Sequence, residues 1–193
     1  MIKVILIHPG STEYDQQHRI QGRLGIPLSD VGREEVRQSM VSLASVGMEV
    51  IYTSTCLAAT ETAEMIGTAL DLKVKVLDKL QNLNLGLWQG MLVEDVRTKQ
   101  PKVYRQWQDH PDNICPPEGE MLDAARFRVE KALDKLSRKH KADTIGLVVP
   151  EPLGSLVRAY FSKNDDQVGD LWKPIATGTW EAISPNSAAE ISK

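Results

Sequence analysis

Cysteine is scarce in this chain of 193 residues, and the sequence has no long hydrophobic run, no block of like charges and no internal repeat. The two cysteines, Cys56 and Cys115, lack C-x-x-C spacing, so we expect two reduced thiols rather than a disulfide framework or a zinc site. The formal net charge is −3 and both signs are mixed along the chain. Neither nucleic acid nor an anionic membrane is therefore an expected partner.

Domain organisation also follows from simple properties of the sequence. Hydrophobic residues make up 41% of the chain, enough to bury a core, and the length fits one domain, expected over residues 1–184. Residues 185–193 are small and polar and are expected to form a flexible tail. The apolar run at residues 4–7 is too short for a signal sequence or a membrane span, so we expect a cytoplasmic protein.

Apolar runs alternate with helical patterns, which indicates an α/β fold. Continuous β-branched runs predict buried strands at residues 4–7 and 144–149, and further strands are expected at 49–53, 74–77 and 178–183. Helical spacing predicts long helices over 31–46, 57–70, 121–140 and 153–161, with short helices at 93–98 and 103–108. Ser29 or Asp30 is expected to cap the first of these helices.

The segment from residue 6 to residue 32 carries a distinctive succession of residues. It begins with a strand, continues through Gly and Thr-Glu-Tyr, and then has Arg-Ile-Gln-Gly and Pro-Leu. This succession resembles the opening of the histidine phosphatase (phosphoglycerate mutase-like) superfamily, which reads Arg-His-Gly, Glu-Thr-x-Trp-Asn, Arg-x-Gln-Gly and Pro-Leu-Thr. The positions that match without gaps are Gly10, Thr12, Glu13, Tyr14, Arg19, Gln21, Gly22, Pro27, Leu28 and Gly32.

Resemblance to this family continues, in the right order, over most of the chain. The segments at 52–64, 80–90, 117–121 and 146–153 are similar to later family motifs. The resemblance implies a three-layer α/β/α sandwich around a mostly parallel central sheet. It also implies a site at the carboxyl ends of the strands, where open α/β sheets hold ligands.

The family's catalytic groups would fall on residues of other types in this sequence. The nucleophilic His falls on Pro9 and its neighbouring Arg on His8, while the second phosphate-binding Arg falls on Ala58. The proton-donating Glu falls on Asn82 and the second catalytic His on Glu151. Family chemistry needs a nucleophilic imidazole, cations around the phosphoryl oxygens and an acid for the leaving group. No catalytic residue of the family type is therefore expected.

The charge of the expected pocket changes as well. Asp15 stands where the family has Asn and Glu151 where it has His, so the pocket is expected to have lost two arginines and gained two acids. Two such acids would repel a phosphate dianion by roughly several kcal/mol at an effective dielectric of about 20. Other residues expected to line the cleft are Ser11, Arg19, Gln21 and Glu120.

Three interpretations of function remain open from the sequence. The first is a non-catalytic family member, a pseudoenzyme with a binding, scaffold or regulatory role and no cofactor. The second is an enzyme with new chemistry at His8, Asp15 and Glu151, whose side chains suit a divalent metal. The third is weak phosphatase or mutase activity, with His8 moved into the nucleophile's position by a one-residue slip. The sequence names no ligand, protein partner or oligomeric state.

Overall fold

The computed structural model describes residues 2–110, 115–162 and 177–183. Its centre is a five-stranded sheet in the order β3-β2-β4-β1-β5, and of these strands only β5 runs antiparallel to its neighbour. The strands are β1 (Lys3–Ile7), β2 (Val50–Thr53), β3 (Lys73–Val76), β4 (Thr144–Val148) and β5 (Trp180–Ile183). The four parallel strands therefore bring their carboxyl ends to one edge of the sheet.

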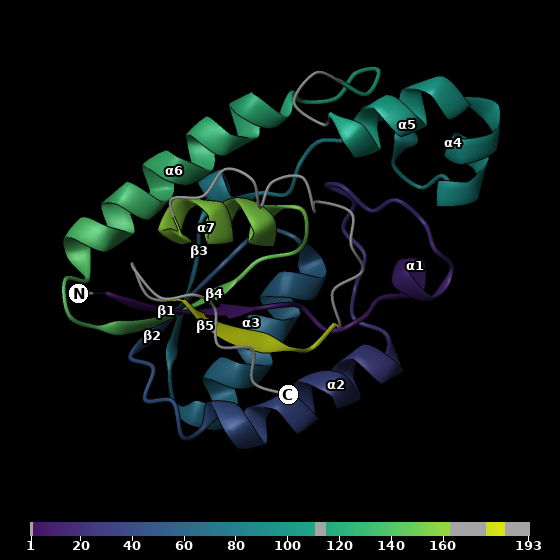
Figure 1. The fold of residues 1–193 in the computed structure, drawn as a ribbon. Helices are drawn as coiled ribbons and strands as arrows, with labels where there is room; N and C mark the ends of the chain where they lie inside the picture. The colour runs from purple at the N-terminus through teal and green to yellow at the C-terminus, as the bar shows by residue number, and fades with distance from the viewer. Residues whose placement is uncertain (1, 111–114, 163–176, 184–193) are drawn as a thin grey trace.

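Helices cover both faces of this sheet, as Figure 1 shows. One face carries α2 (Asp30–Leu43) and α3 (Leu57–Leu70), and the other carries α6 (Leu122–Lys139) and α7 (Leu153–Ser162). The expected three-layer sandwich with a mostly parallel sheet is confirmed. The shorter elements are α1 (Glu13–Gln16), α4 (Val93–Lys99), α5 (Pro101–Asp109) and the 3-10 turns η1 (Asp78–Leu80) and η2 (Gly86–Trp88).

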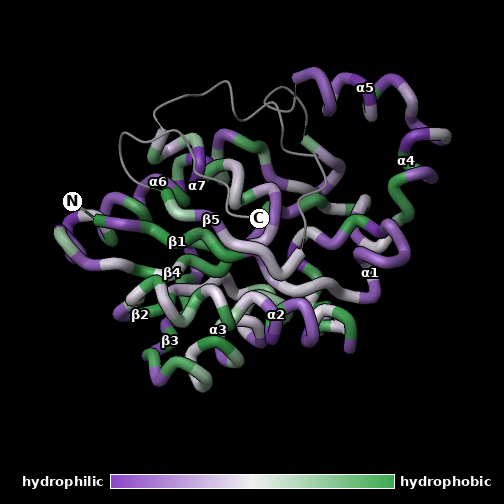
Figure 2. The backbone as a smooth tube through the Cα atoms, turned by 60° about the horizontal axis from the view of Figure 1, so that its bottom comes forward, coloured by the Kyte–Doolittle hydropathy of each residue, from purple (hydrophilic) through white to green (hydrophobic). Residues whose placement is uncertain are grey.

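Strand β1 lies between the two helical layers. Val4 and Leu6 pack into the cluster under α6 and α7, whereas Ile5 and Ile7 pack into the cluster under α2 and α3. All four are at most 1% exposed, which explains why this strand is a continuous apolar run. In Figure 2 the central strands β1 and β4 are green, while the peripheral α5 is largely purple.

The element boundaries follow from local chemistry. The hydroxyl oxygen of Ser29 accepts a hydrogen bond from the Gly32 amide (3.0 Å), so Ser29 caps α2, and the helix ends at Leu43, three residues before the predicted end. The sequence interpretation missed α1, which begins at a capping box between Thr12 and Asp15. None of the helices within residues 2–110, 115–162 and 177–183 has the length and hydropathy of a membrane span. The expected tail at 185–193 lies outside the described residues.

Two glycines of the family pattern fix the loop that follows β1. A Cβ atom on Gly10 would overlap the carbonyl oxygen of Gly32, and a Cβ atom on Gly32 would overlap the carbonyl oxygen of Ser11. Only glycine allows the loop and the first turn of α2 to approach this closely. The backbone after His8 is thereby held against α2.

Candidate functional site

The ends of β1 and β4 bring two of the expected site segments together. Ile7 pairs with Val148 in parallel register, so residues 8–9 and 149–151 leave the sheet side by side at its carboxyl edge. We use the term degenerate site for the positions on which the family's catalytic residues would fall. They are His8, Pro9, Ala58, Asn82 and Glu151.

His8 lies below the surface of this edge, with its side chain 7% exposed. Its Nδ1 atom is 3.8 Å from Oε1 of Glu151, and its Nε2 atom is 3.7 Å from Oε1 of Glu181. The guanidinium of Arg158 lies 3.5 Å from the same Nε2 atom. Both ring nitrogens therefore face charged side chains of the protein.

Arg158 connects the two carboxylates. Its Nη2 donates to Oε1 of Glu151 and its Nη1 donates to Oε1 of Glu181, both at 2.7 Å. We call His8, Glu151, Arg158 and Glu181 the charged quartet. The sequence interpretation missed Arg158 and Glu181 and expected an excess of negative charge around Glu151. Arg158 pairs directly with Glu151, but Glu181 adds a second carboxylate, so two carboxylates share one guanidinium.

The quartet shifts the acidity of its members. Burial alone would raise the pKa of Glu181, but contacts with His8 and Arg158 bring this pKa below its ordinary value. Burial alone would lower the pKa of Arg158, but the charges and hydrogen bonds of Glu151 and Glu181 raise this pKa above its ordinary value. Mutual pairing therefore favours the ionised form of both groups.

The second oxygen of Glu151 is also occupied. Its Oε2 accepts hydrogen bonds from the amide (3.1 Å) and the hydroxyl (2.9 Å) of Ser155 in the first turn of α7. Gly154 packs directly on His8 and Glu151. A Cβ atom at Gly154 would meet the Glu151 carboxylate and lie 3.2 Å from Cε1 of His8. A side chain larger than glycine therefore does not fit at position 154.

Pro9 and Ala58 are buried parts of the scaffold. The Pro9 carbonyl accepts a hydrogen bond from the Gly178 amide (3.0 Å), and the His8 amide donates to the Thr179 carbonyl (2.8 Å). Ala58, in the first turn of α3, is 7% exposed and belongs to the apolar cluster under α2 and α3. Neither side chain can bind or transfer a proton.

Asn82 is held by backbone carbonyls. Its side-chain nitrogen donates to the carbonyl of Gly22 (3.0 Å) and to the carbonyl of Glu151 (3.2 Å), and the residue is 3% exposed. An amide has no proton to exchange near neutral pH. Asn82 therefore joins the loop after β4 to the loop before α2 as a structural bridge.

Asp15 does not face the quartet. Its Oδ2 accepts from the amide and hydroxyl of Thr12, both at 2.7 Å, and its Oδ1 accepts from Nε2 of Gln21 at 2.7 Å. The expectation that Asp15 adds a pocket charge is wrong, because the carboxylate caps α1. Over the ranges that the structure describes, no three His, Cys, Asp or Glu side chains could hold a metal ion together. The hypothetical metal set of His8, Asp15 and Glu151 is thus not brought together.

Ser11 and Arg19, two of the expected cleft residues, have internal partners. The Ser11 amide donates to Oε2 of Glu35 at 2.8 Å, so a carboxylate of α2 already occupies this donor in the loop after β1. Arg19 donates from Nη1 to the Gly90 carbonyl at 2.7 Å. Arg158, rather than Arg19, is therefore the guanidinium in contact with His8.

Glu120 is the centre of a second ionic cluster. Its carboxylate accepts a hydrogen bond from Nη2 of Arg23 at 2.9 Å. It also accepts hydrogen bonds from Nε (2.9 Å) and Nη2 (3.0 Å) of Arg128. Burial alone would raise its pKa, but Arg128 and then Arg23 lower this pKa below its ordinary value. Both arginines also donate to the Asn82 carbonyl, at 3.0 and 3.2 Å. Glu120 thus holds Arg23 and Arg128 beside Asn82 of the degenerate site, instead of projecting freely into a cleft.

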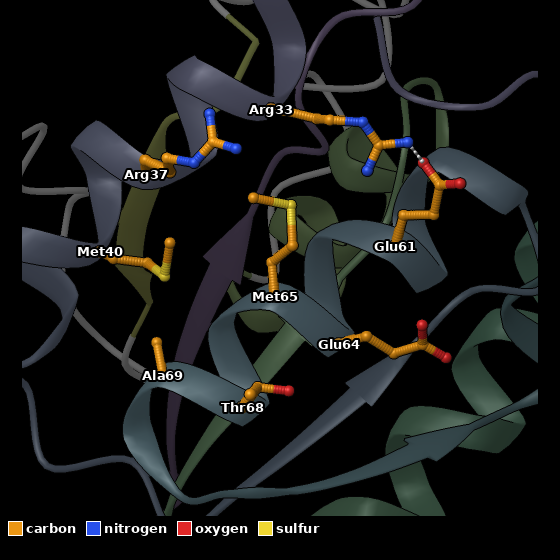
Figure 3. Close-up of a pocket in the computed structure, with 8 residues that line it drawn as sticks. All are labelled: Arg33, Arg37, Met40, Glu61, Glu64, Met65, Thr68 and Ala69. Atoms are coloured by element: carbon orange, nitrogen blue, oxygen red, sulfur yellow. Dashed lines mark hydrogen bonds and ion pairs between the residues drawn. The ribbon is translucent and has the colours of Figure 1, made fainter. Parts of the chain in front are cut away.

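A cavity of about 530 Å³ lies elsewhere, between α2 and α3 (Figure 3). Charged side chains of both signs and apolar side chains line it, and Arg33 pairs with Glu61 across its rim at 3.2 Å. None of its lining residues belongs to the degenerate site. The cavity therefore adds nothing to the chemistry of that site.

Comparison with known proteins identifies the family. The model of the histidine phosphatase superfamily (branch 1) matches residues 4–163, and the chain belongs to this superfamily. Phosphoserine phosphatase 1 of Hydrogenobacter thermophilus is 31% identical over 148 residues, which cover 77% of this chain and 70% of that protein. Phosphoglycerate mutase-like protein 4 of Arabidopsis thaliana is 26% identical over 165 residues, covering 83% and 70%.

Longer relatives and solved structures agree with this assignment. A bifunctional protein of Mycobacterium tuberculosis is 31% identical over 160 residues, and the match spans 43% of its length. The structure of Bacillus stearothermophilus YhfR has a TM-score of 0.86 at 22% identity, covering 100% of this chain and 96% of that one. A mycobacterial glucosyl-3-phosphoglycerate phosphatase in complex with VO3 has a TM-score of 0.86 at 21% identity, covering 98% and 97%. At these identities the two structures support the fold alone.

Proposed function

We propose that this chain is a non-catalytic member of the histidine phosphatase superfamily, with a binding, scaffold or regulatory role. The observation that carries the proposal is the charged quartet. His8 and Glu151, which stand at two of the family's catalytic positions, are satisfied by Arg158 and Glu181 at 2.7 to 3.8 Å. A set of side chains that satisfies itself stabilises the fold and leaves no group prepared for a substrate.

The missing chemistry supports the same conclusion. Pro9 has no nucleophilic atom, Ala58 has no guanidinium, and the amide of Asn82 cannot protonate a leaving group. Uncatalysed hydrolysis of a phosphate monoester needs an acceleration of up to ~10²¹-fold. A site that lacks a nucleophile, an acid and preorganised arginines is not expected to approach that acceleration.

Activity through His8 is the second candidate, because the relatives are named as phosphatases and mutases. An active chain would accordingly be a phosphoric monoester hydrolase or a phosphomutase. Burial of the imidazole between two carboxylates and under Gly154 argues against a nucleophilic His8. The close packing of Gly10 on Gly32 argues for the ungapped match, in which Pro9 takes the nucleophile's position. Metal-dependent chemistry with Asp15 is disfavoured, because that carboxylate caps α1.

A hydrolysis assay tests the proposal. The full chain is incubated with p-nitrophenyl phosphate, phosphoserine and 3-phosphoglycerate, with and without divalent metals. We expect phosphate release equal to the blank, and equal for the wild type and the His8→Ala variant. Turnover that disappears in His8→Ala would contradict the proposal and support the slipped match.

Ligand binding gives a second, independent measurement. Any anion that binds the folded state raises the melting temperature by mass action. We expect phosphate and vanadate at millimolar concentration to leave the melting temperature unchanged, because the Ser11 amide and Arg158 already have carboxylate partners. Saturable protection by vanadate would show that the site still accepts a phosphoryl group.

A further inference from the structure

Strand β3 is the end of the sheet opposite β5. It pairs with β2 on one side, and no strand of the described residues pairs with its other side. Such an edge presents unpaired backbone N–H and C=O groups. Lys73 and Val76, the two ends of the strand, are exposed.

Lysines gather on the face of β3 that looks toward α6. Lys75 pairs in register with Tyr52 of β2, and its Nζ lies 5.6 Å from the centroid of the Tyr52 ring. Lys73, two residues earlier, projects from the same face because side chains alternate along a strand. From the last turn of α6, Nζ of Lys139 lies 5.8 Å from the same ring and donates to the Tyr52 hydroxyl at 3.2 Å.

Lys135 lies one turn before Lys139 and thus on the same side of α6. We call Lys73, Lys75, Lys135 and Lys139 the lysine patch. Among the described residues, no carboxylate forms an ion pair with any of these four ammonium groups. A positive patch therefore flanks an open strand edge on a chain whose net charge is negative.

A buried hydrogen-bond chain holds the centre of the patch in place. Tyr52 is 2% exposed, and its hydroxyl lies 2.8 Å from Nε2 of His140, whose Nδ1 is 2.7 Å from Oδ2 of Asp143. Asp143 thus pairs with His140 and does not neutralise the lysines. The hydrogen bond to Tyr52 raises the pKa of Lys139, so this ammonium group stays charged.

We propose that β3 and the lysine patch bind an extended acidic segment of a partner protein. The segment adds to the outer edge of β3 as a further strand and directs carboxylates at alternate positions toward Lys73 and Lys75. Backbone hydrogen bonds supply affinity in this mode of recognition, and side chains of alternating direction supply specificity. The inference does not depend on the absence of catalysis at the degenerate site.

Two other occupants fit the patch less well. Nucleic acid binds through many phosphate contacts to Lys and Arg, whereas this patch has four lysines on a chain whose net charge is −3. A second copy of this chain, paired through β3 around a twofold axis, would bring the two sets of Lys73 and Lys75 onto one face. Like charges in such neighbouring positions are destabilising.

Fluorescence anisotropy with a labelled peptide tests the proposal. The probe is a peptide of ~10 residues that alternates Glu and Val, a length that covers one strand edge. A peptide of the same charge with proline at alternate Val positions cannot form a strand ladder and serves as the control probe. The protein variants are Lys73→Glu/Lys75→Glu and, as a matched surface control, Lys102→Glu on α5, which is also exposed.

We expect saturable binding of the Glu-Val peptide to the full chain, weakened by added salt. Affinity is expected to fall about tenfold or more in Lys73→Glu/Lys75→Glu and to stay unchanged in Lys102→Glu. The milder Lys73→Gln/Lys75→Gln variant gives the same comparison if charge reversal perturbs folding, which circular dichroism detects.

Four results would overturn the proposal. The wild type could fail to bind the peptide, or bind the proline peptide equally well. A single-stranded oligonucleotide could compete better than the acidic peptide, which would assign the patch to nucleic acid. Sedimentation could reveal a dimer that Lys73→Glu/Lys75→Glu disrupts, which would assign the edge to self-association.

Discussion

The degenerate site and the lysine patch differ in whether their charged side chains have partners of opposite charge. In the charged quartet each ionic group has a partner within 3.8 Å, and the side chains are at most 20% exposed. In the lysine patch no carboxylate of the described residues pairs with an ammonium group, and Lys73, Lys135 and Lys139 are exposed. Breaking a buried ion pair leaves an uncompensated charge and is strongly destabilising, whereas a surface charge contributes little to stability. The degenerate site thus holds its charges within the fold, whereas the lysines beside β3 lie at the surface.

The largest effect is expected from Arg158→Met. This change leaves Glu151 and Glu181 poorly solvated and unpaired, and we expect the free energy of unfolding at pH 7 to fall by about 3 kcal/mol. Urea denaturation measures it. The loss should shrink at low pH, where both carboxylates become protonated. The control is Arg97→Met, which removes an ion pair with Glu94 that is about 60% exposed and is expected to cost less than about 0.5 kcal/mol.

A smaller and pH-dependent effect is expected from Glu181→Gln. Because the pKa of Glu181 is lowered in the folded state, its stabilising contribution is present above its ordinary pKa of 4.5 and disappears as the pH falls through the lower folded value. The stability difference between wild type and variant should therefore be largest near neutral pH. It should approach zero as the pH falls below 4.5. Thermal unfolding of both proteins at a series of pH values from 7 downward measures this stability difference. A difference that is constant with pH would show that Glu181 acts through packing instead of charge.

The smallest effect on stability is expected from Lys73→Glu/Lys75→Glu. Surface substitutions away from caps, cores and ion pairs usually change the free energy of unfolding by less than about 0.5 kcal/mol. A change of that size, together with the loss of peptide binding, would sharpen the contrast between the two regions. A loss comparable to that of Arg158→Met would instead show that Lys73 and Lys75 stabilise the folded chain.

Much of the fold could be predicted from the sequence. The buried strands at 4–7 and 144–149 are continuous apolar runs, and the helix at 57–70 was predicted with the boundaries that the structure has. The predicted end of α2 was three residues too late, because residues 44–46 contain no helix breaker, and the predicted start of β5 was two residues too early. Helix α1 was missed, since four residues give no periodic pattern and only the Thr12–Asp15 spacing signals a cap.

The degenerate site could be located but its electrostatics could not. The match to family motifs gave positions for His8 and Glu151, and the pairing of β1 with β4 brings the two together. Arg158 and Glu181 lie outside those motifs, so only the packing of α7 and β5 around His8 reveals them. The spacing gave no signal either, because Glu151 precedes α7 (Leu153–Ser162) and does not share a helix face with Arg158. Asp15 was misread because its local role as a cap takes precedence over its place in the motif.

The charged quartet would oppose a return of the family's histidine at position 151. A chain that regained histidine at position 151 alone would separate Arg158 from one of its two carboxylates and bring a second imidazole beside His8. Stability would fall while the nucleophile at position 9 and the guanidinium at position 58 were still missing. The substitution at position 151 is therefore expected to lower stability without restoring the other groups of the family's reaction.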